Sequence, residues 1–399
     1  MFDPKLLQLV DEQRIIEIAS DLMRFKSDNP STEDPLNTHN ETEVGEYIYN
    51  FFTSLGISVE KQIAYEKRFN VIATIKGQNP KAPSIAFNGH MDVVPAGDLS
   101  LWKKDPYEPY IDNGLLYGRG ACDMKGAIAC CMHVMELIVK HDLKPQGDVV
   151  FTAVIDEEKS NKGINKLLSS SFKVDSCIVG EASDCEIYVG HRGVLAFDIE
   201  ISGVSCHAAM TAVGQGRNAI TDACKAVAVI KELDKELKQN KSLMLGHSQL
   251  NVTGFQSGIK VNVIPDKAVL QIDGRTALGE NVDDIQALIT ARLDALKNQN
   301  EILDYKIKAT TFCPSYELNE NNEFLAYAKK DAKLSGNKDT LSVFGATCEA
   351  SLIAKTGANV IIFGPGSLKQ AHNVNEFVET LQLAKAAKFY LTAFMGTED

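Results

Sequence analysis

The chain has 399 residues, of which 44% are hydrophobic and 24% are charged, and its formal net charge at pH 7 is −12. This length predicts two domains, and the composition is typical of a folded protein with a large core, which excludes extended disorder. The acidic balance argues against partners such as nucleic acids or acidic membranes, because binding to either needs clustered Lys and Arg. We therefore expect a globular protein that acts on a small molecule.

The N-terminal 25 residues mix charged and apolar side chains at helical spacing, with neither an uninterrupted apolar segment nor a small-residue cleavage site. The sequence contains no run of 18 apolar residues, which is the length that would predict a membrane span. The nine cysteines contain no C-x-x-C pair, which favours a reducing compartment. We expect a cytoplasmic protein.

Four apolar runs in the first half of the chain predict buried strands. They cover residues 70–77, 84–90, 148–158 and 175–181. Residues 124–140 carry apolar side chains at every third or fourth position, which predicts a helix with Asp123 as its N-cap. This alternation predicts an α/β fold in which a mixed sheet has helices on both faces.

The pattern changes at residue 193 and runs strand, helix, strand, strand, helix, strand as far as residue 309. This is the β-α-β-β-α-β order of the ferredoxin-like fold. The strand-like segment NVIIFGPG (359–366) then returns to the first pattern. We therefore expect residues 193–309 to form a smaller domain inserted between residues 1–192 and 310–399.

Ionisable residues gather at the ends of the predicted strands: His90 and Asp92, then Glu157 and Glu158, then Glu181. In such sheets ligands bind beyond the carboxyl ends of the strands, so these side chains should meet at one edge. Asp123 joins them from a helix N-terminus, where the helix dipole favours its charged form. Imidazoles and carboxylates without cysteine indicate a hydrolytic zinc site rather than a structural one.

Two other kinds of site are disfavoured. The segment YGRGACDMKG (117–126) contains G-x-G before a helix, as dinucleotide-binding loops do. However, Asp123 replaces the third glycine, and its carboxylate would stand where a pyrophosphate has to approach. Cys122 and Cys348 lie inside motifs, but neighbouring carboxylates would raise the pKa of a thiol there and so disfavour a cysteine nucleophile.

The order and spacing of these segments resemble the M20 metallopeptidase family over essentially the whole chain. The resemblance is carried by H-x-D at 90–92, G-R-G-x-x-D-M-K-G at 118–126, D-E-E at 156–158, G-E at 180–181, N-V-I-P at 262–265 and G-P-G-S-x-x-Q-A-H-x-x-N-E at 364–376. It implies amide hydrolysis with two zinc ions, although these ligand types also accept cobalt or manganese. It also implies that the inserted domain is a lid or dimerisation domain.

The resemblance assigns roles to individual residues. The implied metal ligands are His90 and Glu181 for one ion, Glu158 and His372 for the other, and Asp123 as the bridge between them. Asp92 is the carboxylate that fixes the imidazole of His90. Glu157 is the general base that takes a proton from water and delivers it to the departing nitrogen. The family often has a cis peptide bond after the bridging aspartate.

In the inserted domain, the resemblance makes His207 the residue that stabilises the oxyanion in the active site of a partner subunit, so a homodimer is expected. Asn262 and Arg275 match positions that contact substrate, and Arg275 could hold a substrate carboxylate with two hydrogen bonds. An internal salt bridge is the alternative for Arg275.

The C-terminal segment is most similar to acetylornithine deacetylases, which have a Glu-Ala pair before the last motif. Here the pair is Glu349 and Ala350, and Glu349 is expected to bind the side-chain ammonium of N-acetylornithine; the alternative is a surface glutamate at a helix start. A succinyl-diaminopimelate desuccinylase or a broader aminoacylase or dipeptidase is the second possibility. A dimeric binding protein without catalysis is the third, but it would be expected to lack Glu157 or a ligand.

Overall fold

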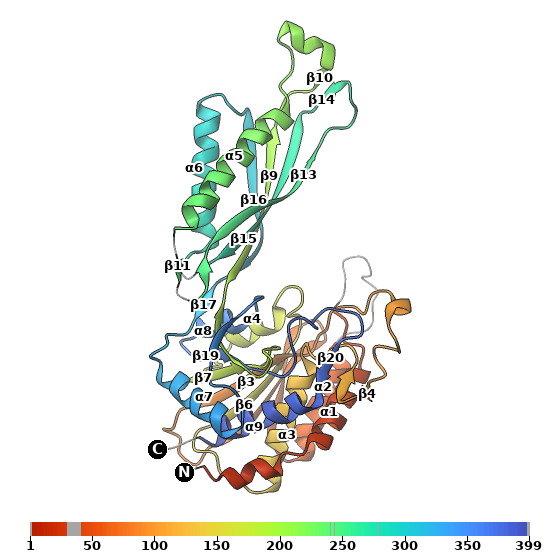
Figure 1. Cartoon of the computed structure of the whole chain (residues 1–399), viewed down its shortest axis with the longest axis vertical. Helices are drawn as coiled ribbons and strands as arrows, with labels where there is room; N and C mark the ends of the chain where they lie inside the picture. Colours follow the sequence, from red (N-terminus) through yellow and green to blue (C-terminus); the bar gives the residue numbers. More distant parts are fainter. Residues whose placement is uncertain (1, 30–40, 240, 243, 278, 397–399) are drawn as a thin grey trace. The chain divides into compact units, whose positions relative to one another are not determined.

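The computed structural model describes residues 2–29, 41–239, 241–242, 244–277 and 279–396. The chain forms two compact units (Figure 1). The first consists of Met1–Gly190, Leu318–Phe344 and Cys348–Asp399, and the second of His191–Glu317 with Gly345–Thr347. The second unit contains the whole segment 193–309 and extends beyond it at both ends. Its role as a lid or dimerisation domain stays a prediction.

The first unit is built on a mixed sheet with the strand order β1-β2-β6-β3-β7-β19-β8, in which β18 also pairs with β8. The four strands β6, β3, β7 and β19 are parallel, whereas β1, β2 and β6 are antiparallel neighbours and β8 is antiparallel to β19. The strands are β1 (Ser58–Tyr65), β2 (Arg68–Ile75), β3 (Ile85–His90), β6 (Val149–Val154), β7 (Ser176–Val179), β8 (Ile187–His191), β18 (Leu341–Phe344) and β19 (Asn359–Ile362).

Helices cover both faces of this sheet, as the sequence predicts. On one face, an aromatic chain joins Phe52 of α2, Phe151 of β6, Phe87 of β3 and Tyr390 of α9. On the other face α4 and α8 contact each other, and they pack on β1 and β2 and on β19. The helices of this unit are α1 (Glu12–Arg24), α2 (Thr42–Ser54), α3 (Lys125–Lys140), α4 (Lys162–Leu168), α7 (Glu323–Leu334), α8 (Ala350–Ala354) and α9 (Thr380–Met395).

Helix α3 lies at the centre of the first unit. Every residue from Lys125 to Ile138 is buried, because α1 and α9 pack against it and it also contacts β3. A helix with apolar side chains on most of its sides needs such a position. The sequence prediction of this helix is therefore confirmed, but its N-cap is Met124 rather than Asp123, and no side-chain hydrogen bond caps it.

The second unit has the predicted ferredoxin-like order. Its elements are β9 (Gly193–Ser202), α5 (Ala219–Leu237), β13 (Gln249–Ser257), β15 (Lys267–Thr276), α6 (Val282–Asn298) and β16 (Asp304–Cys313). The four strands form an antiparallel sheet in the order β13-β15-β9-β16. Buried and half-buried residues alternate along β9, as expected for a strand with one face on a core.

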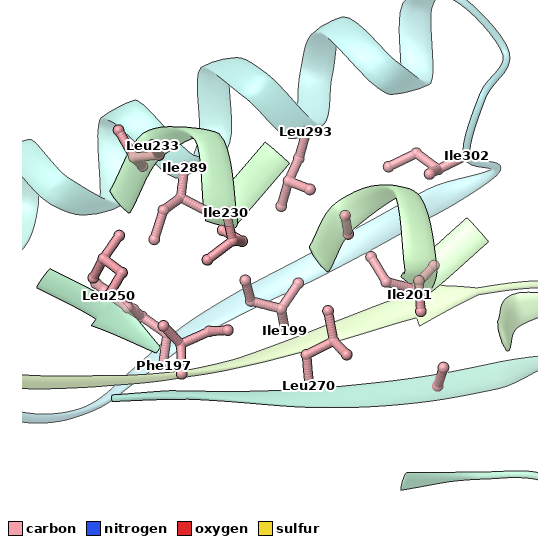
Figure 2. Packing of buried hydrophobic residues seen from close by; sticks show 14 of the residues in the cluster. Phe197, Ile199, Ile201, Ile230, Leu233, Leu250, Leu270, Ile289, Leu293 and Ile302 are labelled. Carbon is pink, nitrogen blue, oxygen red and sulfur yellow. The ribbon is translucent and has the colours of Figure 1, made fainter. Parts of the chain in front are cut away.

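The core of the second unit lies between this sheet and its two helices (Figure 2). Phe197 and Ile199 of β9 face Ile230 of α5 and Ile289 of α6, and all four side chains are at most 1% exposed. This unit therefore has a hydrophobic core of its own. In the part of the chain that the structure describes, no helix combines the length and the apolar character that a membrane span requires.

Candidate metal centre

Four parallel strands bring the candidate residues to one edge of the sheet. His90 is the last residue of β3, and Glu158 and Glu181 follow β6 and β7 after short loops. The loop after β19 leads to His372, and Asp123 precedes α3. Because the carboxyl ends of parallel strands meet at the same edge, residues far apart in the sequence become neighbours.

Asp123 lies between two histidines. Its Oδ1 is 3.0 Å from His90 Nε2, and its Oδ2 is 3.3 Å from His372 Nε2. The Nε2 atom of His372 is also 3.1 Å from the Glu158 carboxylate, and that of His90 is 3.7 Å from Glu181 Oε1. Ligand atoms of His90, Asp123 and Glu158 all lie within 4.8 Å of one another. One carboxylate thus has an oxygen directed at each imidazole.

The imidazole of His90 is fixed by the main chain. Its Nδ1 atom is 2.9 Å from the carbonyl oxygen of Asp92, so an N–H at Nδ1 leaves the Nε2 lone pair facing Asp123. We expected the Asp92 carboxylate to hold this ring, but its Oδ1 is 3.7 Å away. This role of the carboxylate therefore stays a prediction, and the carboxylate also has other partners.

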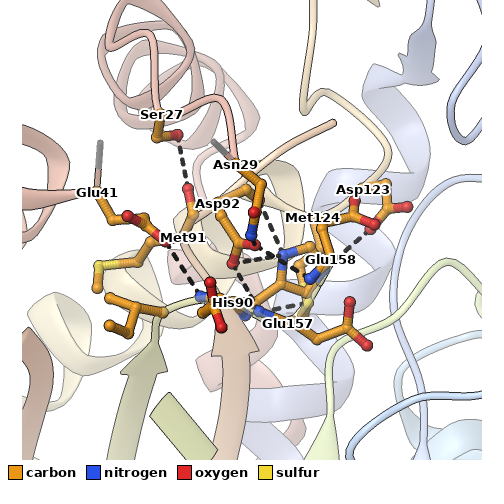
Figure 3. Close-up of polar contacts among 12 residues, drawn as sticks. Ser27, Asn29, Glu41, His90, Met91, Asp92, Asp123, Met124, Glu157 and Glu158 are labelled. Carbon is orange, nitrogen blue, oxygen red and sulfur yellow. Dashed lines mark hydrogen bonds and ion pairs between the residues drawn. The ribbon is translucent and has the colours of Figure 1, made fainter. Parts of the chain in front are cut away.

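The carboxylate of Asp92 instead anchors the loop after β6 (Figure 3). It accepts hydrogen bonds from the main-chain N–H groups of Glu157 and Glu158, each at 3.1 Å, and from the side chain of Asn29. Asp92 is fully buried. It therefore positions the two glutamates through their backbone and His90 through its own carbonyl group.

The loop after β6 departs from the predicted extended backbone. The strand ends at Val154, and Asp156 has a φ of 66°, a left-handed conformation. A buried ion cluster holds this turn: Arg68 donates to Asp156 at 3.0 Å and to Glu41 at 2.7 Å, and the Asp156 N–H donates to Glu41 at 3.1 Å. Sequence reasoning missed Glu41 and Arg68, since nothing in their local pattern distinguishes them.

The peptide bond between Asp123 and Met124 is cis, as the resemblance implies. The turn around it directs the carboxylate of Asp123 at the two histidines rather than at the N–H groups of α3. This explains why Asp123 does not cap the helix.

Burial of several carboxylates at one edge perturbs their protonation. Burial raises the pKa of Glu157 and Glu181 well above the usual value, and it also raises that of Glu158. Burial acts in the same direction on Asp123, but hydrogen bonds with His372 and His90 outweigh it and lower its pKa. Hydrogen bonds with Asp123 and Glu158 raise the pKa of His372 to about 10. The site favours cations, because a positive charge would stabilise the ionised forms of these closely spaced carboxylates.

Three of the predicted site residues lie in the second unit, namely His207, Asn262 and Arg275. His207 is exposed, at the end of β10 (Cys206–His207), which pairs with β14 (Val263–Ile264). Asn262 lies beside it, because the N–H of Ala208 donates to the Asn262 carbonyl at 3.0 Å. The guanidinium of Arg275 forms two hydrogen bonds with Asp273, at 3.1 and 3.0 Å, which is the internal salt bridge considered as the alternative.

Glu349 immediately precedes α8 and is only 1% exposed, so the alternative of a surface glutamate is wrong. Its Oε2 accepts a 2.6 Å hydrogen bond from Asn88, whereas its buried Oε1 has no hydrogen-bond partner among the described residues. Burial raises its pKa to about 7, against the opposing charge of His90. The thiol of Cys122 is also buried and its pKa is raised well above the usual value, which is the direction expected from the sequence.

Comparisons with known proteins agree with this arrangement. The chain is 26% identical to an N-formyl-4-amino-5-aminomethyl-2-methylpyrimidine deformylase of Halalkalibacterium halodurans, over 97% of this chain and 96% of that protein. It is 32% identical to a succinyl-diaminopimelate desuccinylase of Psychromonas ingrahamii, over 75% and 80% of the two chains. Its fold is similar to the crystal structure of aminopeptidase PepT from Bacillus cereus, with a TM-score of 0.80, 20% identity and coverage of 97% and 98%. Residues 86–395 match the description of peptidase family M20/M25/M40, and the chain belongs to this family of hydrolases.

Proposed function

We propose that the protein removes an N-acyl group from an amino acid at a centre of two divalent metal ions, with zinc as the preferred metal. The observation that carries the proposal is the position of Asp123, which has one carboxylate oxygen near each of two histidines. The donor set fits two ions: His90 and Glu181 would hold one, Glu158 and His372 the other, and Asp123 both. Bound metal ions polarise a carbonyl oxygen and lower the pKa of water.

Glu157 is the residue that would move the proton. Its N–H is fixed by Asp92 and its pKa is raised by burial, which suits a carboxylate that accepts a proton from water and passes it to the departing nitrogen. Burial lowers the pKa of His90, but a hydrogen bond with Asp123 and the charge of Glu157 outweigh it and raise this pKa. Its neighbour Glu158 instead faces His372.

N-acetylornithine is the substrate that we propose first. Its side-chain ammonium needs a buried acceptor, and Glu349 offers a carboxylate oxygen that has no hydrogen-bond partner in the part of the chain that the structure describes. Succinyl-diaminopimelate is the second candidate, favoured by the 32% identity to a desuccinylase. Both reactions break an amide bond and release an amino group, so the same metal centre serves either.

The test is a comparison of kcat/KM for N-acetylornithine, N-succinyl-diaminopimelate and N-acetylmethionine, with bound metal measured on the same sample. We expect about two metal ions per chain and the highest value for N-acetylornithine. A highest value for the succinyl substrate would reassign the substrate but keep the chemistry. A protein with two bound metal ions and no hydrolysis of any N-acyl amino acid would refute the proposed reaction.

A homodimer through the second unit and a role for His207 in the partner's active site belong to the same proposal. The exposed position of His207 beside Asn262 supports a role in contacts outside its own fold. The nine cysteines all lie in the described part of the chain and form no disulfide there, and six of them are buried, which supports a reducing compartment such as the cytoplasm.

A further inference from the structure

We infer that Glu376 is a positioning residue for the metal centre, because its carboxylate fixes the segment that carries Asp123 to the segment that carries His372. The inference rests on the proposed two-metal centre. The two segments are far apart in the chain, since Asp123 and Glu376 are separated by 253 positions. The motif around His372 includes Glu376, but neither its spacing nor its composition indicates this role.

The carboxylate of Glu376 is fully buried and accepts four hydrogen bonds. Its Oε1 accepts from the N–H groups of Cys122 at 2.8 Å and Asp123 at 3.0 Å. Its Oε2 accepts from the N–H of Gly120 at 3.0 Å and from the guanidinium of Arg119 at 2.6 Å. Main-chain N–H groups that converge in this way form an anion-binding nest. Here a side chain of the same protein occupies the nest and so fixes the backbone before Asp123.

Further contacts join the same two segments. The N–H of Gly118 donates to the carbonyl of Glu376 at 3.0 Å, and Arg119 also donates to the carbonyl of Asn373 at 3.3 Å. Directly beyond them, β5 (Leu115–Tyr117) and β20 (Phe377–Glu379) form an antiparallel ladder in which Tyr117 lies opposite Phe377. The ladder therefore fixes the register of the two segments and places Glu376 in the nest.

Glu376 helps to fix the position of Asp123, whose two carboxylate oxygens each face a histidine. The nest fixes the N–H of Asp123 itself, and Glu376 is four residues after His372, whose backbone has a φ of 62°. The carboxylate of Glu376 therefore ties the segment that carries His372 to the N–H of Asp123, and the side chains of His372 and Asp123 meet at 3.3 Å. Of the two proposed metal sites, the one formed by Glu158, His372 and Asp123 has two ligands that depend on Glu376. The site formed by His90, Glu181 and Asp123 has only one ligand that depends on Glu376, which is Asp123.

This difference gives a specific expectation for Glu376→Gln. The glutamine has the same shape, but its amide nitrogen donates and cannot accept from the N–H groups that surround it. Outer partners of metal ligands typically change metal affinity by about 10- to 100-fold when they are mutated. We expect a loss of this size for the zinc ion held by Glu158, His372 and Asp123 and a smaller loss for the ion held by His90, Glu181 and Asp123.

Glu136→Gln is the matched control. Glu136 is also a buried carboxylate of the first unit, 3% exposed, and it accepts from Arg14 and Lys140 on helices α1 and α3. Both variants should lower Tm, since both replace a buried carboxylate that has charged partners. Only Glu376→Gln should change the two zinc dissociation constants, measured by competition with a chelator, and the visible spectrum of the cobalt-loaded protein.

Zinc dissociation constants for Glu376→Gln within twofold of the wild type would overturn the inference, as would equal losses in both variants. If Glu376→Gln does not fold, Glu376→Asp is measured instead, because it keeps the charge but is one methylene shorter. We expect Glu376→Asp to lose less zinc affinity than Glu376→Gln would. Wild-type zinc affinities in Glu376→Asp would also overturn the inference. A wild-type protein that binds no zinc would refute the two-metal centre itself, which is a separate outcome.

Discussion

Glu157 and Glu158 are adjacent in the chain, but their surroundings give them different chemistry. Glu158 lies 3.1 Å from His372, whereas Glu157 has a pKa that burial raises well above its usual value. Glu157→Gln should therefore keep both metal ions and lower kcat by at least about 10²- to 10⁴-fold, because only proton transfer is lost. Glu158→Gln should lose metal. Metal content and kcat are measured on the same samples.

The opposite pattern is informative. If Glu157→Gln lost metal but stayed active in an excess of metal, the roles of the two glutamates would be reversed.

Glu349 allows a test of substrate choice. Because a charge-assisted hydrogen bond contributes about 1.5 to 3 kcal/mol, Glu349→Ala should reduce kcat/KM for N-acetylornithine by roughly ten- to a hundred-fold. N-acetylmethionine lacks the cation and should be spared. Glu349→Gln is the control, since an amide keeps the shape and the contact with Asn88 but removes the charge. Equal losses on both substrates would mean that Glu349 supports the site generally.

Single residues were predictable where a motif surrounds them. His90, Asp123, Glu158 and His372 each stand in a recognisable segment, and the structure brings their side chains together. The partners of these residues were harder to predict. Glu41 and Arg68 act on Asp156 only because the fold brings them together across 115 and 88 positions of the chain.

At the scale of elements, the ends of the strands decide the geometry of the site. The predicted run 148–158 reads as one strand, but β6 stops at Val154. Asp156 then takes a left-handed φ of 66°, and its carboxylate pairs with Arg68. Apolar periodicity indicates where a strand lies in a core, but it contains no information on a turn that a buried ion pair stabilises.

The contact between α1 and α3 predicts an acid-dependent loss of stability. Burial raises the pKa of Glu136, but hydrogen bonds with His133, Lys140 and Arg14 outweigh it and lower the pKa from 4.5 to about 2. The folded state therefore binds this proton less readily than the unfolded state, so the contribution to stability is complete above pH 4.5 and is lost as pH falls toward 2.

Urea unfolding of the wild type and Glu136→Gln over this range checks the prediction. The variant should be less stable at pH 7, and the difference between the two free energies of unfolding should shrink as the pH falls from 4.5 to 2. A difference that stays constant would show that the charge of Glu136 does not contribute.

For the whole molecule, the resemblance predicts a site shared between two subunits. Mixed subunits of His207→Ala and Glu157→Gln, each inactive alone, should recover activity, because a heterodimer has one site with both residues intact. The hydrolysis rate of the mixture is compared with that of each variant. Deletion of residues 193–309 should leave a monomer that binds metal but is nearly inactive, and an active monomer would contradict the shared site.

The order of elements in the second unit followed from the sequence, since this unit has the predicted β-α-β-β-α-β pattern. The position of β19 did not. Residues 359–362 insert between β7 and β8, which are consecutive in the chain. Local patterns cannot specify this neighbour, because it depends on pairing between segments separated by the entire second unit.

This insertion has a consequence for how the protein is made. A ribosome releases β7 and β8 long before β19, and N-terminal segments begin to fold first during synthesis. Until the last part of the chain emerges, the edge of β7 that β19 will cover has no strand beside it, and His372 has not yet been synthesised. A chain that ends before residue 372 thus holds four of the five proposed ligands but not the fifth, so we expect that such a fragment does not hydrolyse amides.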